Sequence, residues 1–146
     1  MTDGLTLTLK NSLDEIPKMA DAVEEFAVAH DIPMSTCLHV TLVLDELVTN
    51  VISYGYPDGP AGDRDIVVRM TVEDLNLTVV LEDDGRAFDP TSAPPPDTEA
   101  DLEDRAIGGL GIHFVRNFMD SVHYQRANGY NRLTMRKSLV TEGGPA

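Results

Sequence analysis

The sequence has little of what marks membrane proteins, secreted proteins and disulfide-stabilised domains. Cys37 is the single cysteine among 146 residues, so no internal disulfide can form. No window approaches 18 apolar residues, which predicts that no segment spans a membrane. The first ten residues, MTDGLTLTLK, lack the basic region and apolar run of a signal peptide. We therefore expect a cytoplasmic protein.

Basic residues are scarce as well. The chain has 11 Lys and Arg against 25 Asp and Glu, a formal net charge of -14. Contacts to nucleic-acid phosphates and to anionic lipids need clustered basic side chains, so we expect neither direct nucleic-acid binding nor membrane docking. The hydrophobic fraction of 42% and the length suit a soluble globular protein with a single domain over residues 1–146.

The motifs of several common enzyme classes are absent from the sequence. It contains no GxxxxGK[ST] loop and no protein-kinase set with a strand lysine and an HRD loop. Its four histidines show no metal-ligand spacing with the lone cysteine, so a zinc site is not expected. Ser53 and Ser121 lack a recognisable nucleophile context. Any catalytic chemistry must therefore come from other residues.

Apolar periodicity predicts five strands and three helices. The strands are expected near 5–9, 65–72, 75–81, 121–126 and 130–137, and the helices near 12–30, 38–56 and from 108 onward. Hairpins dominate this order, which argues against a parallel doubly wound sheet. We predict an α+β fold, a two-layer sandwich in which three helices cover one face of a mixed, mainly antiparallel sheet.

A long segment between the third strand and the last helix has an unusual composition. The residues TSAPPPDTEADLEDRAI are mostly Pro, Ser, Thr and acids. A segment of that length without secondary structure, inside a compact domain, is usually either functional or disordered. We predict a mobile lid over about 90–108.

The helix expected at 38–56 carries two polar residues beside its apolar stripe. Glu46 and Asn50 stand four residues apart, just over one turn, so both side chains leave the same face. A carboxylate and an amide at the border of a buried stripe can look into one pocket. They can equally be ordinary boundary residues of a core helix, and this helix alone does not decide between the two.

Two glycine-containing segments offer further candidate positions. Asp83-Asp84-Gly85 follows a strand, where the glycine permits a close approach of a ligand, although such a triplet is also an ordinary turn; Asp84 is expected to face solvent. Gly108-Gly109-Leu110-Gly111 opens a helix, where free backbone N–H groups and the helix dipole favour phosphate. A glycine cluster before a helix is also compatible with a plain loop.

The three segments become specific in combination and in this order. ELVTN at 46–50, EDDGRAFDP at 82–90 and GGLGI at 108–112 resemble the nucleotide-binding boxes of the GHKL ATPase superfamily, which includes gyrase, histidine kinases and MutL. LDELVTNVISYGYPDG and the FDP after the aspartate are most similar to the bacterial anti-sigma factor serine kinases. The resemblance spans nearly the whole chain and implies the histidine kinase-like ATPase (Bergerat) fold, with ATP and Mg²⁺ as cofactors.

The resemblance also implies roles for individual residues. Glu46 corresponds to the candidate general base and Asn50 to the asparagine that coordinates Mg²⁺, while Asp83 accepts a hydrogen bond from the adenine amino group. Gly85 lets the purine lie close to the backbone. The remaining cofactor-binding positions are those of the glycine segment and the last strand: Gly109, Leu110, Gly111 and Thr134. The chain departs from the pattern at Ala87, where many relatives have a second glycine, and this predicts a slightly different turn.

The implied activity is phosphorylation of a small STAS-domain anti-sigma factor antagonist in a partner-switching system. A sigma factor is a possible second partner, and the resemblance suggests a homodimer. An alternative is a nucleotide-binding module that binds a STAS protein or another regulator without sigma-factor control or without kinase turnover. A non-catalytic interaction domain that retains the fold is a third possibility, and the presence of both Glu46 and Asn50 argues against it.

Overall fold

The computed structural model describes residues 4–57, 59, 62–92 and 108–140, and these contain all the strands and helices that the sequence predicts. In chain order the elements are β1 (Gly4–Lys10), η1 (Leu13–Glu15), α1 (Ile16–Ala29), α2 (Met34–Tyr54), β2 (Asp65–Glu73), β3 (Asn76–Asp83), η2 (Pro90–Ser92), α4 (Gly108–Phe118), β4 (Ser121–Ala127) and β5 (Tyr130–Ser138). The predicted lid falls almost wholly on residues 93–107, outside the described residues, so the structure does not test it.

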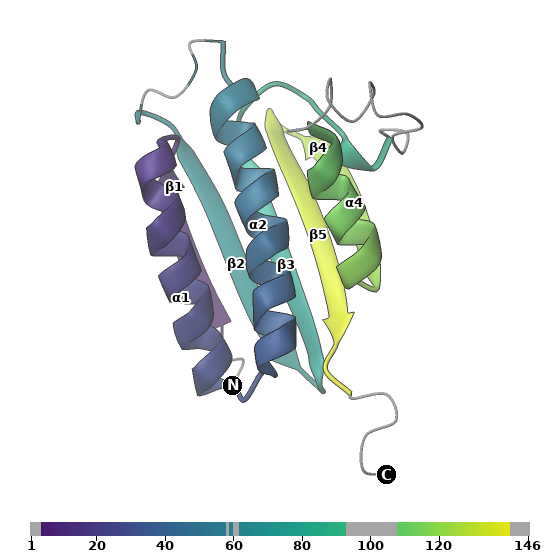
Figure 1. Cartoon of the computed structure of the whole chain (residues 1–146). Helices are drawn as coiled ribbons and strands as arrows, with labels where there is room; N and C mark the ends of the chain where they lie inside the picture. Colours follow the sequence, from purple (N-terminus) through teal and green to yellow (C-terminus); the bar gives the residue numbers. More distant parts are fainter. Residues whose placement is uncertain (1–3, 58, 60–61, 93–107, 141–146) are drawn as a thin grey trace.

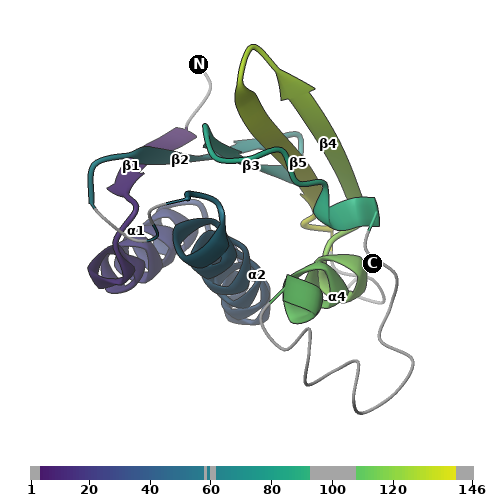
Figure 2. The ribbon, with the colours of Figure 1, turned by 90° about the horizontal axis from the view of Figure 1, so that it is seen from above.

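The five strands form one sheet in the order β1-β2-β3-β5-β4. All four neighbouring pairs are antiparallel, so the described sheet is wholly antiparallel and not mixed as predicted. Helices α1, α2 and α4 lie on the same face of this sheet (Figures 1 and 2). The two-layer α+β sandwich is therefore confirmed. The connection through α4 brings β5 beside β3, which joins the second hairpin to the first.

Both hairpins turn through two residues in the left-handed region of backbone conformation. Asp74 and Leu75 have φ of 51° and 62°, and Asn128 and Gly129 have φ of 55° and 82°. Positive φ at both central residues is the requirement of the type I′ turn, whose twist matches that of the flanking strands. The first turn lies one residue later than the sequence predicted, since its centre is Asp74–Leu75 and not Glu73–Asp74.

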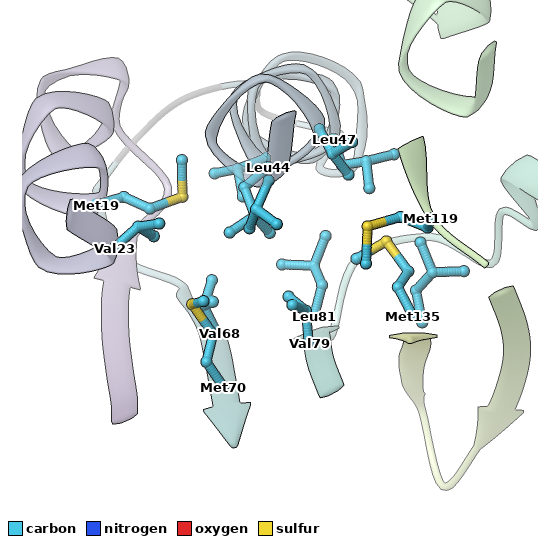
Figure 3. Packing of buried hydrophobic residues seen from close by; sticks show 14 of the residues in the cluster. Met19, Val23, Leu44, Leu47, Val68, Met70, Val79, Leu81, Met119 and Met135 are labelled. Carbon is cyan, nitrogen blue, oxygen red and sulfur yellow. The ribbon is translucent and has the colours of Figure 1, made fainter. Parts of the chain in front are cut away.

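The core lies between the sheet and the helices. Its central layer contains Met19 and Val23 of α1, Leu44 and Leu47 of α2, Val68 and Met70 of β2, Val79 and Leu81 of β3, Met119 after α4, and Met135 of β5 (Figure 3). Strand alternation puts every second residue of β2, β3 and β5 into this layer, and the helical stripes meet them from the other side. This packing holds α2 across the middle of the sheet.

Helix α2 is longer and more apolar than the sequence pattern indicated. It begins at Met34, four residues before the predicted start, and has 21 residues, of which an 18-residue window has a mean hydropathy of 1.2. By length and composition alone such a helix can cross a membrane, contrary to the expectation from the sequence, but this is weak evidence. Its buried stripe, which includes Val40, Val43, Leu44 and Val48, packs on the sheet, and this accounts for the composition as that of a core helix.

Candidate functional site

The first part of the site lies on α2. Glu46 and Asn50 are both half-buried and lie beside the buried residues Leu47 and Val48. Burial raises the pKa of Glu46, and the negative charge of neighbouring Asp45 raises it further. Within the described part of the chain, no basic side chain forms an ion pair with Glu46. A carboxylate in this setting binds a proton more readily than an exposed one, as a general base requires.

Asn50 contributes an oxygen atom that lacks a partner. Its Oδ1 is fully enclosed and accepts no hydrogen bond from the described residues. An enclosed polar atom without a partner is costly, and such atoms often mark a site that another group completes. A neutral oxygen suits Mg²⁺, which prefers oxygen ligands and keeps several waters. The described residues contain no group of three or more His, Cys, Asp or Glu that can hold a metal.

The first turn of α4 lies at the same position along the helix axis as Glu46 and Asn50 of α2. The rings of His39 on α2 and Phe118 on α4 stack with centroids 4.0 Å apart, and the two helices run in opposite directions (Figure 1). At 1.5 Å per residue, the first turn of α4 lies about 10–15 Å from this contact, and Glu46 and Asn50 lie about 10–17 Å from it in the same direction. The Glu46–Asn50 pair and the glycine segment at 108–111, which the sequence predicted separately, therefore lie at the same distance along the two packed helices.

The predicted glycine segment is helical in the structure and not a loop. Helix α4 begins at Gly108, so Gly109 and Gly111 both belong to its first turn. The first four N–H groups of an α-helix have no partner within the helix, and they lie at the positive end of its dipole. These N–H groups can bind a phosphate group. Leu110 belongs to the same turn.

The second part of the site lies at the end of β3. The Asp83 side chain is 6% exposed, and its Oδ1 accepts hydrogen bonds from the Gly85 backbone N–H (2.8 Å) and from Asn131 Nδ2 (3.0 Å). Burial raises the pKa of Asp83, while these two bonds and the positive charge of Arg126 act in the opposite direction. A buried carboxylate held by the backbone and by an amide is suited to accept a hydrogen bond from a ligand.

Gly85 is required because two backbone segments meet at its Cα. A Cβ there would lie 2.7 Å from the carbonyl oxygen of Gly55, which follows α2, and 2.9 Å from Asp83 Oδ1. The same Gly55 carbonyl accepts a hydrogen bond from the Arg86 N–H (2.8 Å). The loop after β3 is therefore fastened to the end of α2, the helix that carries Glu46.

The departure at Ala87 causes no backbone strain. Neither Gly85 nor Ala87 has a positive φ, so an alanine adopts this loop as readily as a glycine. Asn131 holds the loop on either side of Ala87, since its Nδ2 donates to the Arg86 carbonyl (2.9 Å) and its Oδ1 accepts from the Phe88 N–H (3.5 Å).

Asp84 does not simply face solvent as predicted. It accepts hydrogen bonds from the Tyr56 hydroxyl (3.2 Å) and from the Arg64 guanidinium (3.3 Å). Tyr56 is buried, and burial followed by the nearby charges of Asp83 and Asp84 raises the pKa of its hydroxyl. Asp84 thus links the loop after β3 to the segment between α2 and β2.

The structure does not bring Thr134 together with Asp83. Thr134 pairs with Val80, and residues of this phase in β5 point away from the helices, whereas Asn131, Leu133 and Met135 point toward them. Asn131 pairs directly with Asp83. The sequence contained a signal for this residue: Asn131 is a polar side chain in the buried phase of an apolar alternation.

Comparison with known proteins now identifies the family. A family model described as the histidine kinase-like ATPase domain matches residues 9–137. The chain belongs to this family. The resemblance to GHKL ATPases indicated by the three sequence segments is therefore confirmed, together with the fold class.

Curated relatives narrow the comparison. The serine/threonine-protein kinase BtrW of Bordetella bronchiseptica is 34% identical over 103 residues, which cover 70% of this chain and 71% of BtrW. The serine-protein kinase RsbW of Bacillus pumilus is 28% identical over 105 residues, 69% of this chain and 64% of RsbW, so more than a third of RsbW has no counterpart in the match. The anti-sigma F factor of Oceanobacillus iheyensis is 28% identical over 104 residues, 69% of this chain and 68% of that protein. The predicted similarity to anti-sigma factor kinases is confirmed at the level of these relatives.

Solved structures have the same fold. The RsbU and RsbW domains of Rv1364c from Mycobacterium tuberculosis match with a TM-score of 0.67 at 15% identity, covering 94% of this chain and 32% of that chain. The SiaB–SiaC complex from Pseudomonas aeruginosa matches with a TM-score of 0.59 at 15% identity, covering 91% and 88%. At these identities the likeness concerns the fold alone.

Proposed function

We propose that the chain is an ATP- and Mg²⁺-dependent protein serine/threonine kinase of the anti-sigma factor type, which phosphorylates a STAS-domain antagonist in a cytoplasmic partner-switching system. The observation that carries the proposal is the face formed by Glu46, with its raised pKa, and Asn50, with its unpartnered oxygen, level with the first turn of α4. The kinase names of BtrW and RsbW support the same reaction.

Each described residue has a defined part in this reaction. Asp83 and Gly85 hold the base, and the N–H groups of Gly109 and Gly111 bind phosphate oxygens. Glu46 takes the proton of the acceptor hydroxyl while the bond from that oxygen to the γ-phosphorus forms, and the bond to the β,γ-bridging oxygen breaks with ADP retaining the electron pair. Mg²⁺, held by Asn50 Oδ1 and waters, would neutralise charge on the phosphates.

The partners extend the proposal beyond the reaction. Relatives named anti-sigma F factor support a sigma factor as a second partner that is bound when the antagonist is not engaged. We also propose a homodimer as the working state. Sedimentation of the purified chain, alone and with a sigma factor encoded in the same genome, tests both statements: a purely monomeric species that does not associate contradicts them.

Phosphoryl transfer itself is tested with a STAS-domain protein encoded in the same genome. The chain is incubated with ATP, Mg²⁺ and this protein, and intact-mass measurement is expected to show one added phosphate on the partner. A partner variant with its acceptor serine changed to alanine is the matched control and should gain no phosphate.

The alternative of a binding module without turnover makes a distinct prediction in the same experiment. Such a module binds ATP and the STAS protein in calorimetry, yet the mass of the partner does not change. That result contradicts the kinase proposal and favours the alternative.

A further inference from the structure

Both amide hydrogens and the amide oxygen of Asn131 form hydrogen bonds within the protein. Its amide carries two hydrogens, and Nδ2 donates one to Asp83 Oδ1 (3.0 Å) and one to the Arg86 carbonyl (2.9 Å). Its Oδ1 accepts from the Tyr124 hydroxyl (2.5 Å) and from the Phe88 N–H (3.5 Å). The side chain is 8% exposed.

The amide cannot be reversed without loss. A flipped amide would set its oxygen against the Asp83 carboxylate and the Arg86 carbonyl, which are both acceptors, and its NH₂ group against the Phe88 N–H, which is a donor. Because both hydrogens are used inside the protein, Asn131 has none left to donate to a ligand. Any effect of Asn131 on a ligand must therefore pass through Asp83 or through the loop at 84–88.

The arrangement makes the two oxygens of Asp83 unequal. Oδ1 accepts two hydrogen bonds, from Gly85 and Asn131, whereas no described residue donates to Oδ2. Oδ2 has no described partner and yet is not fully enclosed, so part of its surface is accessible to a ligand. Asn131 and the Gly85 N–H together hold Oδ1, so Oδ2 is the carboxylate oxygen left for a ligand.

The loop at 84–88, which follows Asp83, is also held by Asn131 and by residues of the last hairpin. Arg126 donates to the Gly85 carbonyl (2.7 Å), and Asn131 bridges Arg86 and Phe88. Tyr124 and Arg126 come from β4 and Asn131 from β5, so the last hairpin supports the loop after β3.

We propose that Asn131 is a positioning residue that determines purine selectivity, by presenting Oδ2 of Asp83 to an exocyclic amino group while making no contact with the base. This inference rests on the proposed nucleotide-binding function. An ionised carboxylate only accepts hydrogen bonds, so it pairs with the 6-amino group of adenine and repels the 6-carbonyl oxygen of hypoxanthine or guanine. A site built to pair with such a group rejects an analogue that lacks it by a large factor.

The test is the ratio of the affinities for ATP and ITP, measured by calorimetry with Mg²⁺ on the full chain. ITP replaces only the amino group of the base by a carbonyl. We expect the unchanged chain to prefer ATP by roughly 100-fold or more. Asn131→Val should lower this ratio to below roughly 10-fold, since the carboxylate loses one of the two donors that orient it. Asn131→Thr has the same shape as valine but keeps one hydroxyl donor, and it should retain most of the preference.

The control is Thr78→Val on β3, whose side chain lies on the opposite face of the sheet from Asp83 and should leave the ratio unchanged. If the Asn131→Val and Asn131→Thr variants both keep the ratio of the unchanged chain, the inference is overturned. Should the valine variant fail to fold, Tyr124→Phe provides the same test: it removes a donor to Asn131 Oδ1 and should lower the ratio at least twofold, and an unchanged ratio overturns the inference.

Failure of the underlying function gives a different result. If the unchanged chain binds neither ATP nor ITP, the proposed nucleotide site itself is wrong. If it binds both equally, nucleotide binding stands and the role of Asn131 in selectivity does not.

Discussion

The two ends of the candidate site are built in opposite ways. At the end formed by Asp83 and Asn131, hydrogen bonds within the protein fix Oδ1 of Asp83 and the loop that follows it, and Oδ2 of Asp83 has no described donor. At the end formed by Glu46 and Asn50, polar groups remain without a described partner. Hydrogen bonds within the protein thus orient Asp83 at the first end, whereas Asn50 Oδ1 at the second end has no partner among the described residues.

This difference matches the chemistry proposed for each end. Recognition of a base benefits from acceptors and donors fixed in advance, because little ordering is then left to oppose binding. Phosphoryl transfer needs groups whose interactions are completed by the phosphates, the metal and the acceptor hydroxyl. The comparison predicts that substitutions at the Asp83 end disturb folding and recognition of the base, whereas substitutions at the Glu46 end disturb the reaction and the Mg²⁺-dependent part of nucleotide binding but not folding.

The largest effect is expected for Glu46→Gln. The amide keeps the shape of the side chain but cannot accept a proton, so transfer to the STAS protein should fall roughly 100- to 10,000-fold. Affinity for ATP should stay within about twofold, because a general base acts on the acceptor and not on the nucleotide. Quantitative mass measurement of the phosphorylated partner gives the rate, and Glu24→Gln on the exposed side of α1 is the control. A rate above a tenth of the original contradicts the assignment.

The next largest effect is expected for Asp83→Asn. If the amide oxygen keeps the two bonds from Gly85 and Asn131, its NH₂ group faces the amino group of adenine, donor against donor. Loss of a hydrogen bond to a charged group costs about 1.5–3 kcal/mol, roughly a 10- to 150-fold loss of ATP affinity in calorimetry. Asp84→Asn, whose partners are Tyr56 and Arg64, should leave the affinity nearly unchanged. Equal losses in both variants contradict the role of Asp83.

Gly85→Ala tests the contact between the loop after β3 and the end of α2, which connects the two ends of the candidate site. Its new Cβ would lie 2.7 Å from the Gly55 carbonyl, so α2 and the loop must separate, and overpacking of this kind lowers the free energy of unfolding by about 1–3 kcal/mol. Urea unfolding measures the loss. Ala87→Gly, two residues further on at a position without positive φ, should cost less than about 1 kcal/mol. Similar losses in the two variants argue against a close contact at Gly85.

Asn50→Leu, at the Glu46 end, is expected to have the opposite effect on the free energy of unfolding. The leucine removes an enclosed oxygen without a partner, so without nucleotide the chain should be as stable or more stable by up to about 1 kcal/mol in urea unfolding. The same variant should lose the Mg²⁺-dependent part of its ATP affinity in calorimetry. A clear loss of stability without nucleotide shows that Asn50 is structural, and the contrast between the two ends then fails.

The smallest effect concerns the pH dependence of transfer. Glu46 works as a base only when ionised, and its pKa is raised, so transfer should fall as the pH drops through a value above that of an ordinary glutamate. Asp45→Asn removes a negative charge that raises this pKa, and the acid limb of the rate profile should therefore move to lower pH. Asp21→Asn on α1 is the control and should leave the limb in place. A shift to higher pH in the Asp45 variant contradicts the sign.

The Glu46 end of the site was largely predictable, because local geometry determines it. Residues four apart on a helix share a face wherever that helix packs, so the pairing of Glu46 with Asn50 follows from helical periodicity alone. The glycines at 108–111 were likewise predictable as the start of a helix, and the alternative of a plain loop is wrong because α4 begins at Gly108. What remained open was the spatial relation of these two segments, which the antiparallel packing of α4 on α2 decides.

The Asp83 end was predicted only in part. The resemblance pointed to Asp83, Gly85 and Thr134, and the sequence analysis did not single out Asn131, which pairs with Asp83. The omission of Asn131 has a physical cause: successive residues of a strand point to opposite faces, and the sequence of β5 alone does not say which residue meets Asp83. Asn131 lies 48 residues from Asp83, and only the register between β3 and β5 brings the two side chains together.

The sequence by itself thus determined the order of the elements, the apolar faces and the residues that share a helical turn, since these depend on the local periods of helix and strand. Tertiary structure alone decided the pairing of β5 with β3, the contact between Gly55 and Gly85, and the choice of Asn131 as the partner of Asp83. Each of these joins segments far apart in the chain, and their proximity depends on how the whole sheet and its helices pack.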